Sequence, residues 1–150
     1  MIESFHGRLL ILSIAAAFTV SPFASAQPVP EGRTAQDRRF VTGGVGLEES
    51  EQMKAMAPDF PLAIIVAAKS GAYVADTHVK IQDAQGKMVL EMQLDSPYLL
   101  VDLARGKYNL EATHQGQKQQ RSVNIDASTR AKVVFSFDVP DDRAGIASNN

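Results

Sequence analysis

The stretch DSPYLLVDLARGKYNLEA, residues 95–112, decides the fold class of this 150-residue chain. Apolar side chains occupy every second position in residues 99–103 and again in 108–112, with Gly106 between the two runs. Side chains along a strand alternate between its two faces, so this period predicts two strands that each bury one face. The glycine predicts a tight turn between them. The inward-facing residues are expected to be Leu99, Val101, Leu103, Tyr108, Leu110 and Ala112.

Five further strands are expected around this stretch. Residues 61–68 read PLAIIVAA, which is typical of a strand that is buried on both faces. Period-two alternation recurs in four other segments, namely 77–82, 88–95, 118–126 and 131–139. Short strands at regular spacing, with turn residues between them, are typical of a β-sandwich. We therefore predict an all-β fold, a seven-stranded sandwich with Ig-like Greek-key connections.

One short helix is expected before the sandwich, at about residues 47–57. Its first turns are acidic, which suits the positive end of a helix dipole, and Pro58 ends it. Because residues 27–39 carry proline, glycine and charge without periodicity, we interpret 27–60 as a flexible leader that contains this helix. Met53 and Met56 lie three residues apart, and the preferred interpretation is that the helix plugs one edge or end of the sandwich. The alternative is that both methionines dock a partner.

The first 26 residues have the pattern of a secretory signal peptide. Arg8 precedes an apolar run over residues 9–20, and Ala24-Ser25-Ala26 has the small residues that signal peptidase accepts. The run is too short for a helix to cross about 30 Å of hydrocarbon. We therefore expect a mature chain that starts at Gln27, is periplasmic or secreted, and has no stable membrane span after cleavage.

Composition narrows the possible partners and chemistry. The net charge is −2 and the pI is about 5.9, whereas nucleic-acid-binding domains are usually basic, so we expect no nucleic-acid partner. The chain has no cysteine, which excludes a cysteine nucleophile, thiolate metal ligands and disulfides. An exported protein without disulfides must be stabilised by its apolar core.

Residues 71–110 resemble the carboxypeptidase regulatory-like domain family, whose fold is a transthyretin-like (prealbumin-like) β-sandwich. The first family motif, a strand followed by a glycine turn, corresponds to ADTHVKIQDAQG at residues 75–86. The second corresponds to LDSPYLLVDLARGKYNL at residues 94–110. Pro97 stands where the family usually has glycine, and Ala104-Arg105 replaces its usual pair of prolines, so the turns are expected to differ more than the fold.

The resemblance implies a domain at residues 61–139 in a small exported bacterial protein. It also implies a non-catalytic accessory or binding module, in which Gly106 marks a turn and Tyr108 places its ring in the core. Hydroxyisourate hydrolases of the transthyretin-like fold end in Tyr-Arg-Gly-Ser, whereas this chain ends in Ala-Ser-Asn-Asn. That activity is therefore not expected. The small, polar residues 140–150 are expected to form a disordered tail.

Few side chains are candidates for chemistry. His78 and His114 are the only histidines after the expected signal peptide, and a zinc site needs three or four convergent ligands. Ser70, His114 and Asp126 have the residue types of a catalytic triad, but no nucleophile-elbow motif accompanies them. We therefore expect both histidines at the surface, no metal, no cofactor, no catalytic residues and no enzymatic activity.

The expected function is that of a non-catalytic, exported β-sandwich that binds a protein or an envelope component. Met53 and Met56 are its candidate interaction residues if the helix docks the partner. The alternative is binding of a small molecule or carbohydrate by loops near Tyr73, an aromatic residue beside the Ser70-Gly71 turn. A hydrolase is the least favoured possibility. The identity of the partner and the oligomeric state stay open.

Overall fold

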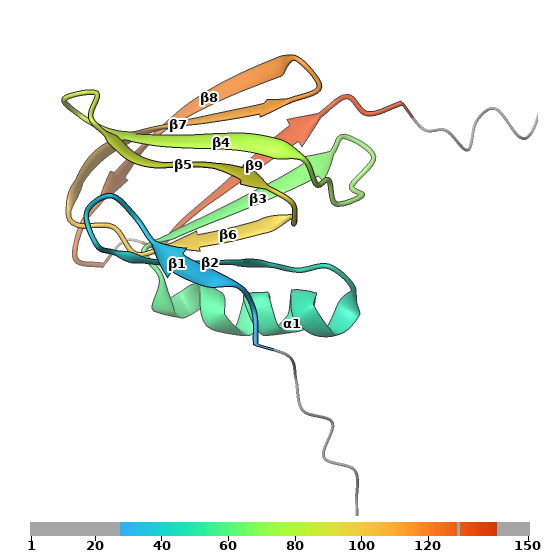
Figure 1. The fold of residues 1–150 in the computed structure, drawn as a ribbon, viewed down its shortest axis with the longest axis horizontal. Coiled ribbons are helices and arrows are strands. Elements are labelled where there is room, and N and C mark those ends of the chain that lie inside the picture. Colours follow the sequence, from blue (N-terminus) through green and yellow to red (C-terminus); the bar gives the residue numbers. More distant parts are fainter. Residues whose placement is uncertain (1–27, 129, 141–150) are drawn as a thin grey trace, which may run out of the picture.

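The computed structural model describes residues 28–128 and 130–140, which form two β-sheets packed face to face, with one helix outside them (Figure 1). The predicted all-β sandwich is confirmed. The expected signal peptide, and all of the expected tail except Pro140, lie outside the described residues. The strands are β1 (Glu31–Arg33), β2 (Arg39–Gly43), β3 (Leu62–Ala68), β4 (Thr77–Asp83), β5 (Met88–Leu94), β6 (Tyr98–Val101), β7 (Gly106–His114), β8 (Gln117–Ile125) and β9 (Ala131–Phe137).

The described residues form nine strands, two more than the seven predicted. The five-stranded sheet has the order β1-β2-β6-β3-β9, and the four-stranded sheet has the order β5-β4-β7-β8. Both additional strands come from the expected leader: β2 pairs antiparallel with β6, and β1 pairs with β2. Residues 39–43 therefore belong to the sandwich. Their pairing is with a strand some sixty positions later in the sequence, Phe40 opposite Val101, so local periodicity gives little sign of it.

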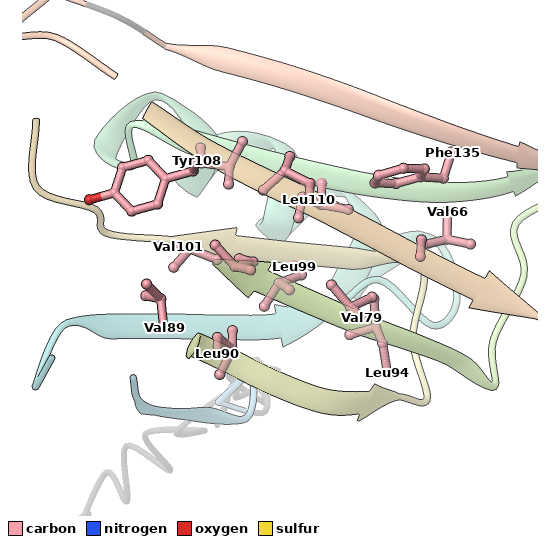
Figure 2. Packing of buried hydrophobic residues seen from close by; sticks show 14 of the residues in the cluster. Val66, Val79, Val89, Leu90, Leu94, Leu99, Val101, Tyr108, Leu110 and Phe135 are labelled. Carbon is pink, nitrogen blue, oxygen red and sulfur yellow. The ribbon is translucent and has the colours of Figure 1, made fainter. Parts of the chain in front are cut away.

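Strands β6 and β7, which were expected to be joined by a tight turn, lie in opposite sheets. Leu99 and Val101 on β6 and Leu110 on β7 enter the same inter-sheet cluster from its two sides (Figure 2). The connection between the strands therefore crosses from one sheet to the other and is not a hairpin. Tyr108 fixes this crossing, because its buried ring packs in the core and its hydroxyl donates a 2.8 Å hydrogen bond to the carbonyl of Ala104.

Helix α1 (Leu47–Met56) ends within one residue of the predicted limit and continues as a 3-10 turn over Ala57–Asp59, which contains Pro58. It covers the outer face of the five-stranded sheet, on the side away from the four-stranded sheet (Figure 1). The helix explains why all seven residues of β3 are buried, as predicted. The cluster between helix and sheet consists of Val41, Met53, Phe60, Ala63, Ile65, Tyr98 and Leu100.

The connection between β2 and α1 packs closely on β6. Gly44 has a φ of +101°, and a Cβ atom at this position would overlap the ring of Tyr98. Ser50 donates a 2.8 Å hydrogen bond to the carbonyl of Gly44, and the carboxylate of Glu49 accepts one of 2.9 Å from the amide of Val45. These contacts tie the first turns of the helix to the connection, so the position of α1 on the sheet depends on the glycine.

Candidate functional site

A groove with a volume of about 490 Å³ lies on the outer face of the five-stranded sheet, between the C-terminal end of α1 and strand β9. Its floor is part of β3, where Ala63 and Ala67 flank Ile65 on the outer face. The helix covers the neighbouring strands, and the two small alanine side chains keep the floor low beside it. The full lining is Lys54, Ala57, Ala63, Ile65, Ala67, Tyr73, Tyr98, Lys132 and Val134.

Two tyrosines form one wall of the groove. The hydroxyls of Tyr73 and Tyr98 are hydrogen-bonded at 2.6 Å, and the rings meet edge to face with their centroids 5.3 Å apart. Tyr73 follows β3 in a loop that is fixed to that strand, because it bridges to Ala67 and the amide of Val74 donates to the carbonyl of Val66. The wall is therefore anchored to the sheet, although Tyr73 itself is 49% exposed.

The Tyr98 hydroxyl stays protonated well beyond neutral pH. Burial of the Tyr98 ring, followed by its hydrogen bond to Tyr73, raises the pKa of the Tyr98 phenol above its usual value of about 10. One hydroxyl of the pair donates to the other, so one O–H donor is left for another acceptor. The groove thus offers a neutral hydrogen-bond donor beside an apolar floor.

The charged residues of the groove are both cationic. The ammonium group of Lys54 lies 2.8 Å from the Glu51 carboxylate, and this hydrogen bond raises the pKa of Lys54. Lys132, on β9, forms no ion pair with any residue in the described part of the chain. None of the lining residues is acidic. The groove can therefore accept an apolar group together with an anion.

The structure separates the three predicted interaction residues. Met53 is fully buried between α1 and the sheet, where it is a core residue that holds the helix, so its side chain is not open to a partner as the docking alternative requires. Met56 is half-buried against the same cluster and lies outside the groove lining. Tyr73 lines the groove, at the place proposed for the small-molecule alternative.

Sequence reasoning missed Val134 as part of this surface. The valine lies in the solvent-facing phase of residues 131–139, between Lys132 and Ser136, and is 43% exposed. An apolar residue among otherwise polar, outward-facing positions indicates an exposed apolar surface, so the sequence does contain a signal for Val134. It contains no such signal for Ile65, because every residue of its strand is apolar.

One of the two histidines, His114, is placed differently from the surface expectation. His114 is 4% exposed; its Nδ1 lies 3.2 Å from the carbonyl oxygen of Asp76, and its ring packs 5.4 Å from that of Phe137. Its burial is the correction, and the reason is that the end of β7 is covered by the C-terminal half of β9. His78 is half-exposed and lies 3.2 Å from the Glu91 carboxylate.

The three triad-type residues do not converge. His114 pairs with Gln117 at one end of the β7–β8 ladder, whereas Asp126 follows Ile125 at the other end. Within residues 28–128 and 130–140, no three His, Asp or Glu side chains come together as metal ligands. In the same residues, no helix is long and apolar enough to cross a membrane.

A known protein family matches the part of the chain that contains the strands of the groove. Residues 64–136 match the Rhizobiales growth-associated tandem repeat domain, a span that begins inside β3 and ends inside β9. This is not the carboxypeptidase regulatory-like family that the sequence resembles; the β-rich fold is compatible with that resemblance without confirming it. No curated protein matches the chain. The matched part of the chain is thus similar to a domain that occurs as tandem repeats, and it excludes β1, β2 and α1.

Proposed function

We propose that this protein is a non-catalytic binding module that holds a segment of a partner protein in the groove beside Tyr73. The observation that carries the proposal is the combination of an apolar floor, an anchored pair of tyrosines and two lysines in one groove. Binding sites commonly have this composition, in which apolar area supplies affinity and a few polar groups fix orientation.

A protein segment suits the composition of the groove. Apolar side chains of the partner would cover Val134, which is exposed, and the small accessible part of Ile65. A carbonyl or carboxylate of the partner would accept the free hydrogen bond of the tyrosine pair. Tyrosine is enriched at protein interfaces because it offers a rigid apolar ring with a polar end.

The second candidate function is binding of a small molecule with an apolar body and an acidic group. The volume of about 490 Å³ lies within the range of ligand pockets, and Lys132 is available for the acid. A thermal-shift screen of such compounds separates the two candidates. A ligand present at about a hundred times its Kd stabilises a folded protein by about 2.7 kcal/mol, which is readily seen as a rise in Tm.

Replacement of Tyr73 by alanine is expected to weaken peptide binding by about tenfold or more. The change removes one wall of the groove and the hydrogen-bond partner of Tyr98. Peptides selected against the purified protein from a display library would be labelled, and their Kd measured by fluorescence anisotropy.

Leu47→Ala is the matched control for this measurement. Leu47 is 79% exposed at the opposite end of α1 and lies outside the groove lining, so its loss removes apolar surface at another site. Equal affinities of the Tyr73→Ala variant and the wild-type protein would contradict the proposal. A selection that yields no binder would do so as well.

We further propose that the protein is exported, as the signal-peptide pattern of the first 26 residues indicates. Its partner would then be a protein of the envelope or the exterior. Mass spectrometry of the protein recovered from the host periplasm tests this, because cleavage is expected to leave Gln27 as the first residue. Recovery of the uncleaved chain from the cytoplasm would refute it.

A further inference from the structure

Strand β9 is an edge of the five-stranded sheet and is bonded to β3 by alternate residues only. The amide of Ala131 donates to the carbonyl of Pro61, and the carbonyl of Phe137 accepts from the amide of Lys69. In a parallel pair, every second residue of a strand directs both its amide and its carbonyl toward the same neighbouring strand, as Ala131 and Phe137 do here. Residues 132, 134, 136 and 138 therefore direct their amides and carbonyls away from β3, toward the open edge.

Glutamine side chains from β8 cover the C-terminal half of this edge. The carbonyl of Ser136 accepts a hydrogen bond from the side-chain amide of Gln119. Gln117 makes two bonds to the main chain of Asp138, donating to its carbonyl at 2.7 Å and accepting from its amide at 3.1 Å. These side chains take the place of a neighbouring strand and close this half of the edge.

The N-terminal half of the edge is open. In the part of the chain that the structure describes, no group pairs with the outward-facing amides and carbonyls of Lys132 and Val134. Both side chains also line the groove. A strand added at this edge would thus bond to the main chain of β9 and place alternate side chains on the groove face.

The charge beside the open edge is positive. Within the described part of the chain, Lys132 has no ion-pair partner and the guanidinium of Arg121 hydrogen-bonds only to Gln119 and Gln120. The same guanidinium lies 5.8 Å from the ring centroid of Phe135. Two cations without carboxylate partners favour an acidic neighbour. They disfavour a second copy of β9, because a two-fold pairing would bring both sets of cations together.

We propose that the partner enters as an extended, acidic segment that adds a strand to β9 at Lys132–Val134. Its main chain pairs with these two residues, its apolar side chains lie on Val134 and the groove floor, and a carboxylate faces Lys132. This inference rests on the proposed function of the groove and names the conformation and charge of its occupant. Strand addition is an established mode of peptide recognition, in which the main chain supplies affinity and the side-chain pockets supply specificity.

The test compares Val134→Pro with Val134→Ala. Proline removes an amide hydrogen that has no partner within the described fold, and proline is tolerated on edge strands, so the variant is expected to fold. Alanine removes the apolar side chain and keeps the amide. The probes are short labelled peptides in which valine and aspartate alternate with serine, so that one face of the strand is apolar and acidic.

The proline variant is expected to lose about tenfold or more in peptide affinity, with a smaller loss in the alanine variant. Peptides N-methylated on the edge that faces β9 should bind as poorly to the wild-type protein, whereas methylation of the opposite edge should have little effect. The two N-methylated peptides test strand addition on the wild-type protein, so the test does not depend on whether the proline variant folds.

Equal binding by both Val134 variants, together with no difference between the two methylated peptides, would overturn strand addition. If Tyr73→Ala then still weakened binding, the groove function would stand without it. Binding that is unaffected by all of these changes would overturn both. Concentration-dependent dimerisation that Val134→Pro abolishes would identify a second copy as the occupant and would overturn the acidic partner.

Discussion

Replacing Phe135 by alanine is expected to lower the free energy of unfolding by about 3–5 kcal/mol. Phe135 is fully buried on β9, among the largest side chains of the cluster between the two sheets (Figure 2). The change removes a whole ring from between two sheets that β9 and its neighbours hold at a fixed spacing. The cavity can close only partly, because the surrounding core is densely packed.

Urea unfolding followed by circular dichroism measures this loss. Lys132→Ala is the control, since Lys132 is exposed on the opposite face of the same strand and its removal should change stability by no more than about 0.5 kcal/mol. The chain has no cysteine, so no disulfide can mask the effect. Similar losses in the two variants would show that the inner and outer faces of β9 are assigned wrongly.

Replacing Gly44 by alanine is expected to lower the free energy of unfolding by about 2–5 kcal/mol, which is the second large effect. The residue has a φ of +101°, which strains any residue with a Cβ atom, and the new methyl group would overlap the Tyr98 ring. Relief requires Tyr98 or the whole connection to move. Because Tyr98 forms the groove wall with Tyr73, the variant should also weaken peptide binding.

Gly46→Ala separates these two causes. Gly46 has a φ of +83°, yet no atom lies within 4 Å of the position that a Cβ would take. Gly46→Ala therefore introduces backbone strain without a steric overlap, and it should lower the free energy of unfolding by only about 1–2 kcal/mol. Both variants would be compared by the same urea titration. An equal cost at the two positions would mean that Gly44 does not fix the helix through contact with Tyr98.

Period-two alternation predicted the strands wherever one face of the strand meets the core and the other meets water. This condition holds for β4, where the predicted inward residues are the buried ones, and for β9, where they are more buried than the outward residues beside them. It fails for β1, which is three residues long and is ordered by pairing with β2. The alternation also cannot show which strands share a sheet. The apolar residues of β6 and β7 alternate in the same way whether the two strands pair in one sheet or lie in two sheets that face each other.

The groove was only partly predictable for a related reason. Tyr73 stood out because it is an aromatic residue beside a glycine turn. The position of the helix determines the rest of the lining. Because both faces of a strand such as β3 are apolar, no local sequence pattern predicts which part of it the helix will leave uncovered. Met53 illustrates the same limit, since methionine spacing is identical for a helix that docks a partner and for one that packs on its own sheet.

Amide-resolved NMR titration with a selected peptide tests the groove beside Tyr73 most directly as the binding surface. The predicted result is a set of saturable shift changes at Ile65, Tyr73 and Val134, which come from three separate segments of the chain and all line the groove. Changes confined to the outer face of the four-stranded sheet, at residues such as Lys80 and Glu111, would contradict it.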